Sequence, residues 1–185
     1  MTSDEDRRLL LGLARDAITA HVIGAANDSG RAQDVRRSDG SVLARRGAAF
    51  VTLHRRGELR GCIGHLDPDA PLARVISECA VSACSADPRF APVTAVELGE
   101  IAVELSLLGP LERLTSATEI EIGRHGLLVE RRGMRGLLLP QVAVEWGWDA
   151  ETFLAQTCHK AGLPRDAWRN GATVWRFEAE VFGEG

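Results

Sequence analysis

One short run of the sequence carries the residue types of a nucleophilic site. Residues 59–64 read Leu-Arg-Gly-Cys-Ile-Gly, so Cys62 stands between two glycines and two positions after Arg60. In an extended strand Arg60 and Cys62 point to the same face, and a guanidinium beside a thiol stabilises the nucleophilic thiolate. The backbone amides of Gly61 and Gly64 offer donors for an oxyanion on a closely approaching substrate. The run predicts a reactive cysteine, and the alternative is a buried cysteine in a strand whose glycines are needed for packing.

A nucleophilic cysteine needs a group nearby that accepts the proton of its thiol. His65 follows Cys62 by three positions, and His159 lies next to a further cysteine in the C-terminal part of the chain. Glu78 and Glu104 are carboxylates within otherwise apolar segments. These four residues are the candidates for proton transfer.

A metal site is the third interpretation of the cysteine. Cys62 and His65 have the spacing of half a structural zinc site, but no second C-x-x-C or C-x-x-H motif follows. Cys79 and Cys84 fall in a segment of helical periodicity and are better explained as core residues. The sequence also lacks a P-loop, a G-x-G-x-x-G run and an H-E-x-x-H motif. We therefore predict neither a metal ion nor a cofactor.

Arg89 is a candidate for ligand binding. It stands in the run Asp87-Pro88-Arg89-Phe90, which is typical of a helix end followed by a packed aromatic residue, because proline does not continue a helix. An exposed arginine is the ordinary expectation for such a position. An arginine that binds an anionic ligand is the functional alternative.

Length, composition and charge exclude several classes of protein. The chain has 185 residues, of which 45% are hydrophobic and 26% charged, enough for one full core or for two small subdomains. A net charge of −4 does not favour nucleic acid as a partner, and the arginines within 131–135 lack interleaved aromatic residues. The N-terminus is charged from its start, and no stretch has the length and apolarity of a membrane span. We expect a cytoplasmic protein whose four cysteines are reduced.

Periodicity and turn residues predict the elements that position these groups. Apolar residues at helical spacing predict helices, alternation predicts strands, and proline and glycine mark their ends. The expected helices are 5–26, a segment from Pro71 to about residue 86, 140–146 and 149–161, the last with Asp149 as its N-cap. The expected strands are 48–56, 59–64, 101–108, 127–129, 137–139 and 173–181, with a tight turn at Gly57-Glu58 and a hairpin whose turn falls at residues 131–133. Residues 27–47 are expected to form a loop, which is the best candidate for a hinge or an insertion. Runs of strands with helices between some of them favour an α+β fold on a mixed or antiparallel sheet.

The motif at residues 59–64 resembles the signature of the AMMECR-domain family. Several further stretches resemble the same family in order and spacing, and together they span about residues 45–178. They are Asp87-Pro88-Arg89-Phe90, Val103-Glu104-Leu105-Ser106, Gly123-Arg124-His125-Gly126, residues 136–142, Gly147-Trp148-Asp149 to Phe153-Leu154, Cys158 and residues 160–164. The resemblance implies one domain over residues 1–185, with two subdomains that share a seam near the signature motif.

The resemblance also implies partners without naming a reaction. Prokaryotic relatives are similar to the A component of a three-part system with a Memo-type protein and a radical SAM protein, and Cys158-His159 resembles that branch. His65 stands where the family has a small or hydroxyl residue, so His159 becomes the preferred base.

Three functions follow from these observations. The first is a small cytosolic enzyme in which Cys62 attacks a small-molecule substrate, Arg60 stabilises the thiolate, and His159 or Glu104 transfers protons. The second is a subunit without chemistry of its own that binds the Memo-type and radical SAM proteins. The third, which charge and composition do not favour, is a nucleic-acid binder acting through residues 131–135.

Overall fold

The computed structural model describes residues 2–24, 41–66 and 68–184 of the chain. Most of the predicted 27–47 loop lies outside these residues. Its end forms the short 3-10 helix η2 (Val42–Ala44), in which Val42 and Leu43 are buried. None of the helices found in the described ranges is long and apolar enough to cross a membrane.

The chain divides into two compact units. One contains Met1–Leu107 and Glu180–Gly185, and the other contains Leu108–Ala179. Each is built from antiparallel strands with flanking helices, which confirms the predicted α+β class.

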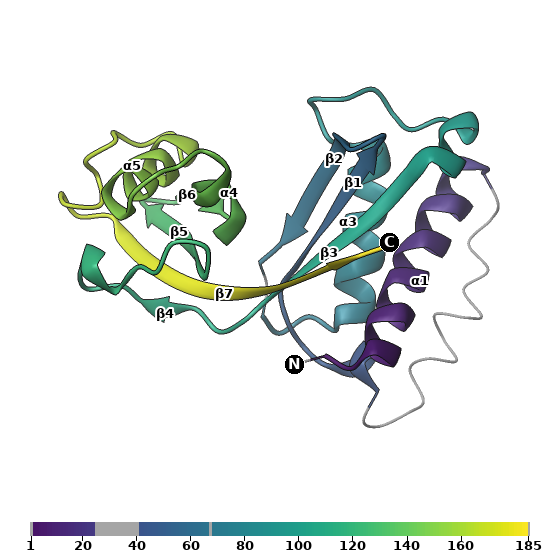
Figure 1. The fold of residues 1–185 in the computed structure, drawn as a ribbon, viewed down its shortest axis with the longest axis horizontal. Coiled ribbons are helices and arrows are strands. Elements are labelled where there is room, and N and C mark those ends of the chain that lie inside the picture. Colours follow the sequence, from purple (N-terminus) through teal and green to yellow (C-terminus); the bar gives the residue numbers. More distant parts are fainter. Residues whose placement is uncertain (1, 25–40, 67, 185) are drawn as a thin grey trace. The chain divides into compact units, whose positions relative to one another are not determined.

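The first unit is an antiparallel sheet whose helices α1 and α3 lie side by side (Figure 1). Its strands lie in the order β2-β1-β3. In chain order the elements are α1 (Asp4–Val22), η2, β1 (Ala49–Arg55), β2 (Glu58–His65), α3 (Leu72–Ser85), η3 (Ala95–Glu100) and β3 (Ile101–Leu108).

Local sequence explains where the first helix begins and ends. The side chain of Ser3 caps α1 by accepting from the amide of Asp6, and acidic residues fill the first turn, where the helix dipole is positive. The helix ends at Val22 and not at residue 26 as predicted. Gly24 has a φ of 67°, a left-handed conformation that stops a helix.

The core of this unit lies between the helices and one face of the sheet. Alternate residues of β1 and β3 point into it, together with one side of α1 and of α3. The inward strand residues are Ala49, Val51, Leu53, Ile101, Val103, Leu105 and Leu107, and the helix residues include Leu10, Ala14, Ile18, Val75, Ile76, Cys79, Ala80 and Ala83. Because strand side chains alternate, Phe50, Thr52 and His54 of β1 lie on the opposite face of the sheet.

A tight turn and a β-bulge set the register of β2 on β1. Arg56 and Gly57 have φ values of 53° and 84°, as a two-residue hairpin turn requires, so the turn begins one residue before the predicted position. Leu53 pairs with Gly61, whereas His54 pairs with Leu59, which leaves Arg60 as the extra residue of a bulge.

The second unit has its own sheet and core. β5 (His125–Arg131) pairs with β6 (Met134–Leu138) and with β7 (Thr173–Gly183), and β7 also pairs with β4 (Glu112–Arg113). The remaining elements are η4 (Ala117–Glu119), α4 (Pro140–Glu145) and α5 (Ala150–Lys160), and the core includes Leu127, Val129, Phe153, Leu154 and Cys158. The predicted β5–β6 hairpin and the Asp149 cap of α5 are both confirmed.

Candidate functional site

Cys62 lies in a row of polar residues that crosses the sheet of the first unit. It is directly opposite Thr52 of β1, and Thr52 is directly opposite Glu104 of β3. Residues directly opposite each other in antiparallel strands share a face, so all three side chains lie on the face away from α1 and α3. Cys62 is half-buried on this face.

Thr52 is the residue of this row that contacts the thiol. Its Oγ1 donates to Sγ of Cys62 over 3.3 Å, and the threonine is 7% exposed. A buried hydroxyl that donates to the sulfur orients the thiol side chain on this face of the sheet. The register of the hairpin therefore gives Cys62 a hydrogen-bond donor from the neighbouring strand.

The backbone of Cys62 is held by the segment that follows α3. β2 is the edge strand of this sheet, so alternate amides and carbonyls point away from β1. The amide of Cys62 donates to Oδ2 of Asp87 over 2.9 Å, and Nη2 of Arg89 donates to the carbonyl oxygen of Cys62 over 3.4 Å. The backbone amide and carbonyl of Cys62 are thus both hydrogen-bonded to the loop after α3, through Asp87 and Arg89.

Asp87 is a buried carboxylate that fixes Arg89 at this position. Its side chain is 2% exposed, and besides the Cys62 amide it accepts from the amide, Nε and Nη2 of Arg89 at 3.1, 3.0 and 2.7 Å. The hydrogen bond from Arg89 holds the pKa of Asp87 well below its usual range. The pKa of Arg89 is raised, first by its hydrogen bond to Asp87 and further by the Cys62 thiol beside it. A cation fixed by a buried anion therefore stands at Cys62.

His54 and Glu104 form a second pair of titratable groups on the same face. Nε2 of His54 lies 3.9 Å from Oε1 of Glu104, and the two side chains are 34% and 32% exposed. Nε2 is itself buried and has no hydrogen-bonding partner among the residues that the structure describes. The pair lies beside Thr52, because His54 is two residues further along β1 and Glu104 is opposite Thr52 on β3.

The predicted contact between Arg60 and the thiol is replaced by an ion pair with Glu97. The bulge at Arg60 breaks the alternation on which that prediction depended. Nε of Arg60 donates to Oε1 of Glu97 over 3.0 Å, and Nη1 donates to the carbonyl of Ala91 over 2.9 Å. The hydrogen bond from Arg60 lowers the pKa of Glu97 to about 2. Arg60 therefore anchors the loop after α3, and Arg89 is the guanidinium at the cysteine.

The two glycines of the motif are required by packing. A Cβ at Gly61 would lie 2.2 Å from the carbonyl oxygen of Ala83 in α3, and a Cβ at Gly64 would lie 2.2 Å from the ring of Phe50. Because the amide of Cys62 points away from β1, the amide of Gly61 points toward β1 and into the ladder, whereas that of Gly64 points away from it. Of the two amides predicted to bind an oxyanion, only that of Gly64 points out of the sheet at the edge of β2, where a substrate could accept from it.

The comparisons with known proteins agree on one family. A family model described as AMMECR1 matches residues 11–182. The chain belongs to the AMMECR1 family. A relative in Methanothermobacter thermautotrophicus is 46% identical over 98% of this chain and 96% of its own length, and one in Thermococcus gammatolerans is 45% identical over 98% and 91%. The crystal structure of an uncharacterized protein, PH0010 of Pyrococcus horikoshii, matches with a TM-score of 0.87 and 39% identity, over 99% of this chain and 93% of that one.

Within the first unit of the AMMECR1 domain, the two other bases considered from the sequence lie outside the row. His65 pairs with Ala49, whose side chain points into the core, so His65 lies on the opposite face from Cys62 and is exposed. Glu78 is exposed on α3, where it binds Arg74. His159 belongs to the second unit and is exposed on α5. Among the sequence candidates for the base, Glu104 is the one that the first unit places in the row with Cys62.

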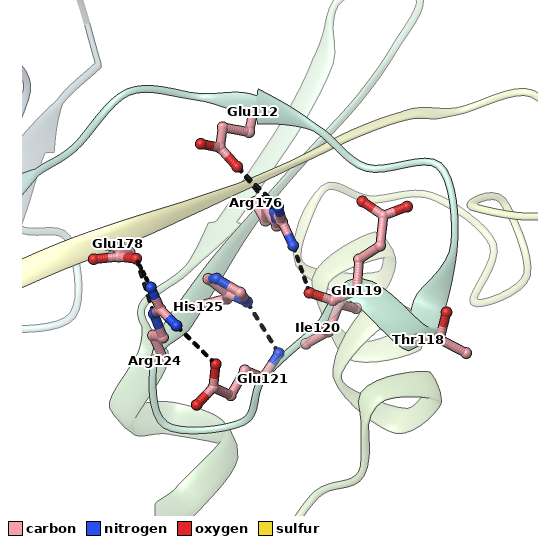
Figure 2. Close-up of a pocket in the computed structure, with 9 residues that line it drawn as sticks. All are labelled: Glu112, Thr118, Glu119, Ile120, Glu121, Arg124, His125, Arg176 and Glu178. Carbon is pink, nitrogen blue, oxygen red and sulfur yellow. Dashed lines mark hydrogen bonds and ion pairs between the residues drawn. The ribbon is translucent and has the colours of Figure 1, made fainter.

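The second unit of the AMMECR1 domain has a polar hollow of its own (Figure 2). It has a volume of about 510 Å³ and is lined by residues that include Arg124, His125 and Arg176. Arg176 binds Glu112 and the carbonyl of Glu119, and Arg124 binds acidic side chains on both sides. Nδ1 of His125 accepts from the amide of Glu121 over 3.0 Å. Its cations are already paired and it contains no cysteine, so it is not the site that the signature motif indicates.

Sequence reasoning missed Thr52, Asp87 and His54. Thr52 was missed because the turn alone would place Val51 opposite Cys62, and the bulge at Arg60 shifts the register by one residue so that Thr52 stands there instead. The signal for Asp87 was weak, since an aspartate before proline is also a common helix end. Nothing in the sequence spacing links His54 to Glu104, which are 50 residues apart.

Proposed function

We propose that this AMMECR1-family protein is a thiol-dependent enzyme in which Cys62 is the nucleophile. The observation that supports it is the set of groups gathered at Cys62: a hydroxyl on the sulfur from Thr52, and Arg89 fixed by buried Asp87. A hydroxyl that donates to the sulfur and a fixed cation at the same residue are surroundings that suit a nucleophilic thiol.

The chemistry is attack of Sγ on an electrophilic carbon of a small molecule. The S–C bond forms as the electron pair of the carbon's bond to its leaving group, or of its carbonyl π bond, moves away from that carbon. The thiol proton passes to the His54–Glu104 pair, with Thr52 lying between the sulfur and Glu104. An oxygen that becomes negative would face the amide of Gly64.

A purely structural cysteine accounts for less of the geometry. Packing explains both glycines, but it does not explain the hydroxyl that Thr52 donates to the sulfur or the guanidinium that buried Asp87 fixes at Cys62. The other three cysteines show the structural pattern, since Cys79, Cys84 and Cys158 are buried. Burial raises the pKa of the Cys79 thiol to about 12 and also raises the pKa of the Cys84 and Cys158 thiols.

The test is alkylation of the native protein by iodoacetamide, mapped to each cysteine by mass spectrometry. We expect Cys62 to be labelled at neutral pH while Cys79 remains unlabelled. Labelling of Cys62 only after the protein unfolds would contradict the proposal.

A genetic test separates the enzyme from a subunit that only binds the Memo-type and radical SAM proteins. In a host that depends on this gene, Cys62→Ser is expected to fail to complement, and Cys84→Ser serves as the control at a buried thiol. Full complementation by Cys62→Ser would favour the partner-binding function instead.

A further inference from the structure

From the way Arg89 is held, we infer that the substrate of Cys62 carries a carboxylate next to its electrophilic carbon. This inference rests on the proposed function, since it names the class of molecule that the thiol would attack. It starts from the donors of Arg89 that the protein leaves unused.

Arg89 is oriented by one edge of its guanidinium and presents the other. Nε and Nη2 donate to Asp87, and Nη2 also contacts the carbonyl of Cys62. No hydrogen bond of Nη1 is found within the described part of the chain, and the side chain is 54% exposed. Nη1 therefore offers two N–H donors to a ligand in solution.

The orientation of Arg89 is fixed before any ligand arrives. Asp87 is 2% exposed and accepts from the amide, Nε and Nη2 of Arg89, so one edge of the planar group is fixed by two hydrogen bonds. The ring of Phe90 adds a contact, with its centroid 5.4 Å from Cζ of Arg89. A guanidinium that is already ordered loses little conformational entropy when it binds an anion.

The position of Arg89 relative to the thiol limits which anions fit. The same guanidinium touches the backbone of Cys62 and is close enough for the thiol to raise the pKa of Arg89. An anionic group bound to this guanidinium lies at the residue whose thiol would react, so we infer that the electrophilic carbon is bonded to the anionic group or is close to it in the same molecule. A carboxylate on the adjacent carbon meets this condition, and it also matches the donors of a guanidinium edge.

Two alkylating reagents of nearly equal size test this inference. Iodoacetate and iodoacetamide both transfer their CH₂ carbon to sulfur with loss of iodide, but only iodoacetate carries a carboxylate on that carbon. The measured quantity is the ratio of the two rate constants at Cys62, divided by the same ratio for Cys62 in the unfolded protein. We expect the native protein to prefer iodoacetate by about tenfold, which corresponds to a hydrogen-bonded ion pair of modest strength.

Matched variants assign the preference to Arg89. Arg89→Gln is expected to lose the preference, whereas Arg56→Gln makes the same charge change at an exposed turn residue and should retain it. Arg89→Lys keeps the charge and should retain part of the preference. Circular dichroism of each variant confirms that the fold is intact.

The outcomes separate the inference from the function on which it rests. If native Cys62 is labelled fast by iodoacetamide but shows no preference for iodoacetate, the inferred carboxylate on the substrate is wrong and the proposed nucleophile is retained. The same conclusion follows if the preference for iodoacetate persists in Arg89→Gln. Resistance of native Cys62 to both reagents overturns the proposed function and this inference with it. If inorganic phosphate slows the labelling of Cys62 by iodoacetate more strongly than acetate does, the inferred carboxylate is wrong and the anionic group of the substrate is a phosphate.

Discussion

Replacing Asp87 by asparagine tests whether the buried carboxylate holds the site together. The carboxylate accepts from the amide of Cys62 and from three donors of Arg89. Asparagine keeps the shape but has one acceptor oxygen, so its NH₂ group must face donors that the carboxylate now satisfies. At least one bond, to the Cys62 amide or to Arg89, is then lost.

The expected cost follows from these contacts. A hydrogen bond to a charged acceptor contributes about 1.5–3 kcal/mol, and the Cys62 amide makes one of these bonds. The ion pair itself adds less than about 1 kcal/mol, because the Arg89 side chain is 54% exposed and water screens it. We expect Asp87→Asn to lower the free energy of unfolding at pH 7 by about 2–4 kcal/mol.

The loss should depend on pH in a defined direction. The pKa of Asp87 is lowered in the folded state, so its contribution is fully present above the unfolded value of about 3.9 and is lost as the pH falls through the folded pKa. The difference between wild type and Asp87→Asn should therefore be complete at pH 7 and shrink once the pH is below about 4.

The assay must report on the first unit. All four tryptophans lie within residues 146–175 and so in the second unit, which makes fluorescence a probe of that unit alone. Hydrogen exchange of the Cys62 amide reports on the first unit, and denaturation followed by far-UV circular dichroism reports on both units together. Asp149→Asn is the matched control, because asparagine caps a helix as well as aspartate does. If the free energy of unfolding of Asp87→Asn at pH 7 is within about 0.5 kcal/mol of the wild-type value, the buried carboxylate does not hold the site together.

Three further predictions address the remaining contacts. Gly61→Ala places a Cβ 2.2 Å from a backbone oxygen of α3 and should cost about 2–3 kcal/mol in denaturation experiments. Gly12→Ala, with nothing within 4 Å, should instead add about 0.5–1 kcal/mol, and equal effects of the two would argue against the clash. Thr52→Val should slow alkylation of Cys62 about 3- to 10-fold, because the hydroxyl that donates to the sulfur is lost, and Thr52→Ser should preserve the rate. An unchanged rate in Thr52→Val would show that Thr52 does not contribute to the reactivity of Cys62. Because the pKa of Cys79 is raised to about 12, alkylation of the native protein should leave Cys79 unlabelled when the pH is raised from 7 to 9. A label found on Cys79 by peptide mapping would show that the core opens.

Much of the fold was predictable because its signals are local. The amphipathic stripe of α3, the alternation of β3 and the turn at Arg132-Gly133 each depend on residues a few positions apart. The boundaries that were wrong, at the end of α1 and at the β1–β2 turn, depend on backbone conformations at single residues. Such positions are weakly encoded in composition.

The sequence by itself determined that Cys62 is the residue to examine, because cysteine between glycines in a strand is identifiable from residue type and spacing alone. Only the tertiary structure decided which groups surround it. A one-residue bulge turns Arg60 to Glu97, and the chain reversal after α3 brings Asp87 and Arg89 to the edge of β2. The antiparallel register then places Thr52 and Glu104 in line with the thiol. Side-chain direction in a sheet changes with every single-residue shift in register, and that register is set by turns and packing that local sequence patterns do not specify.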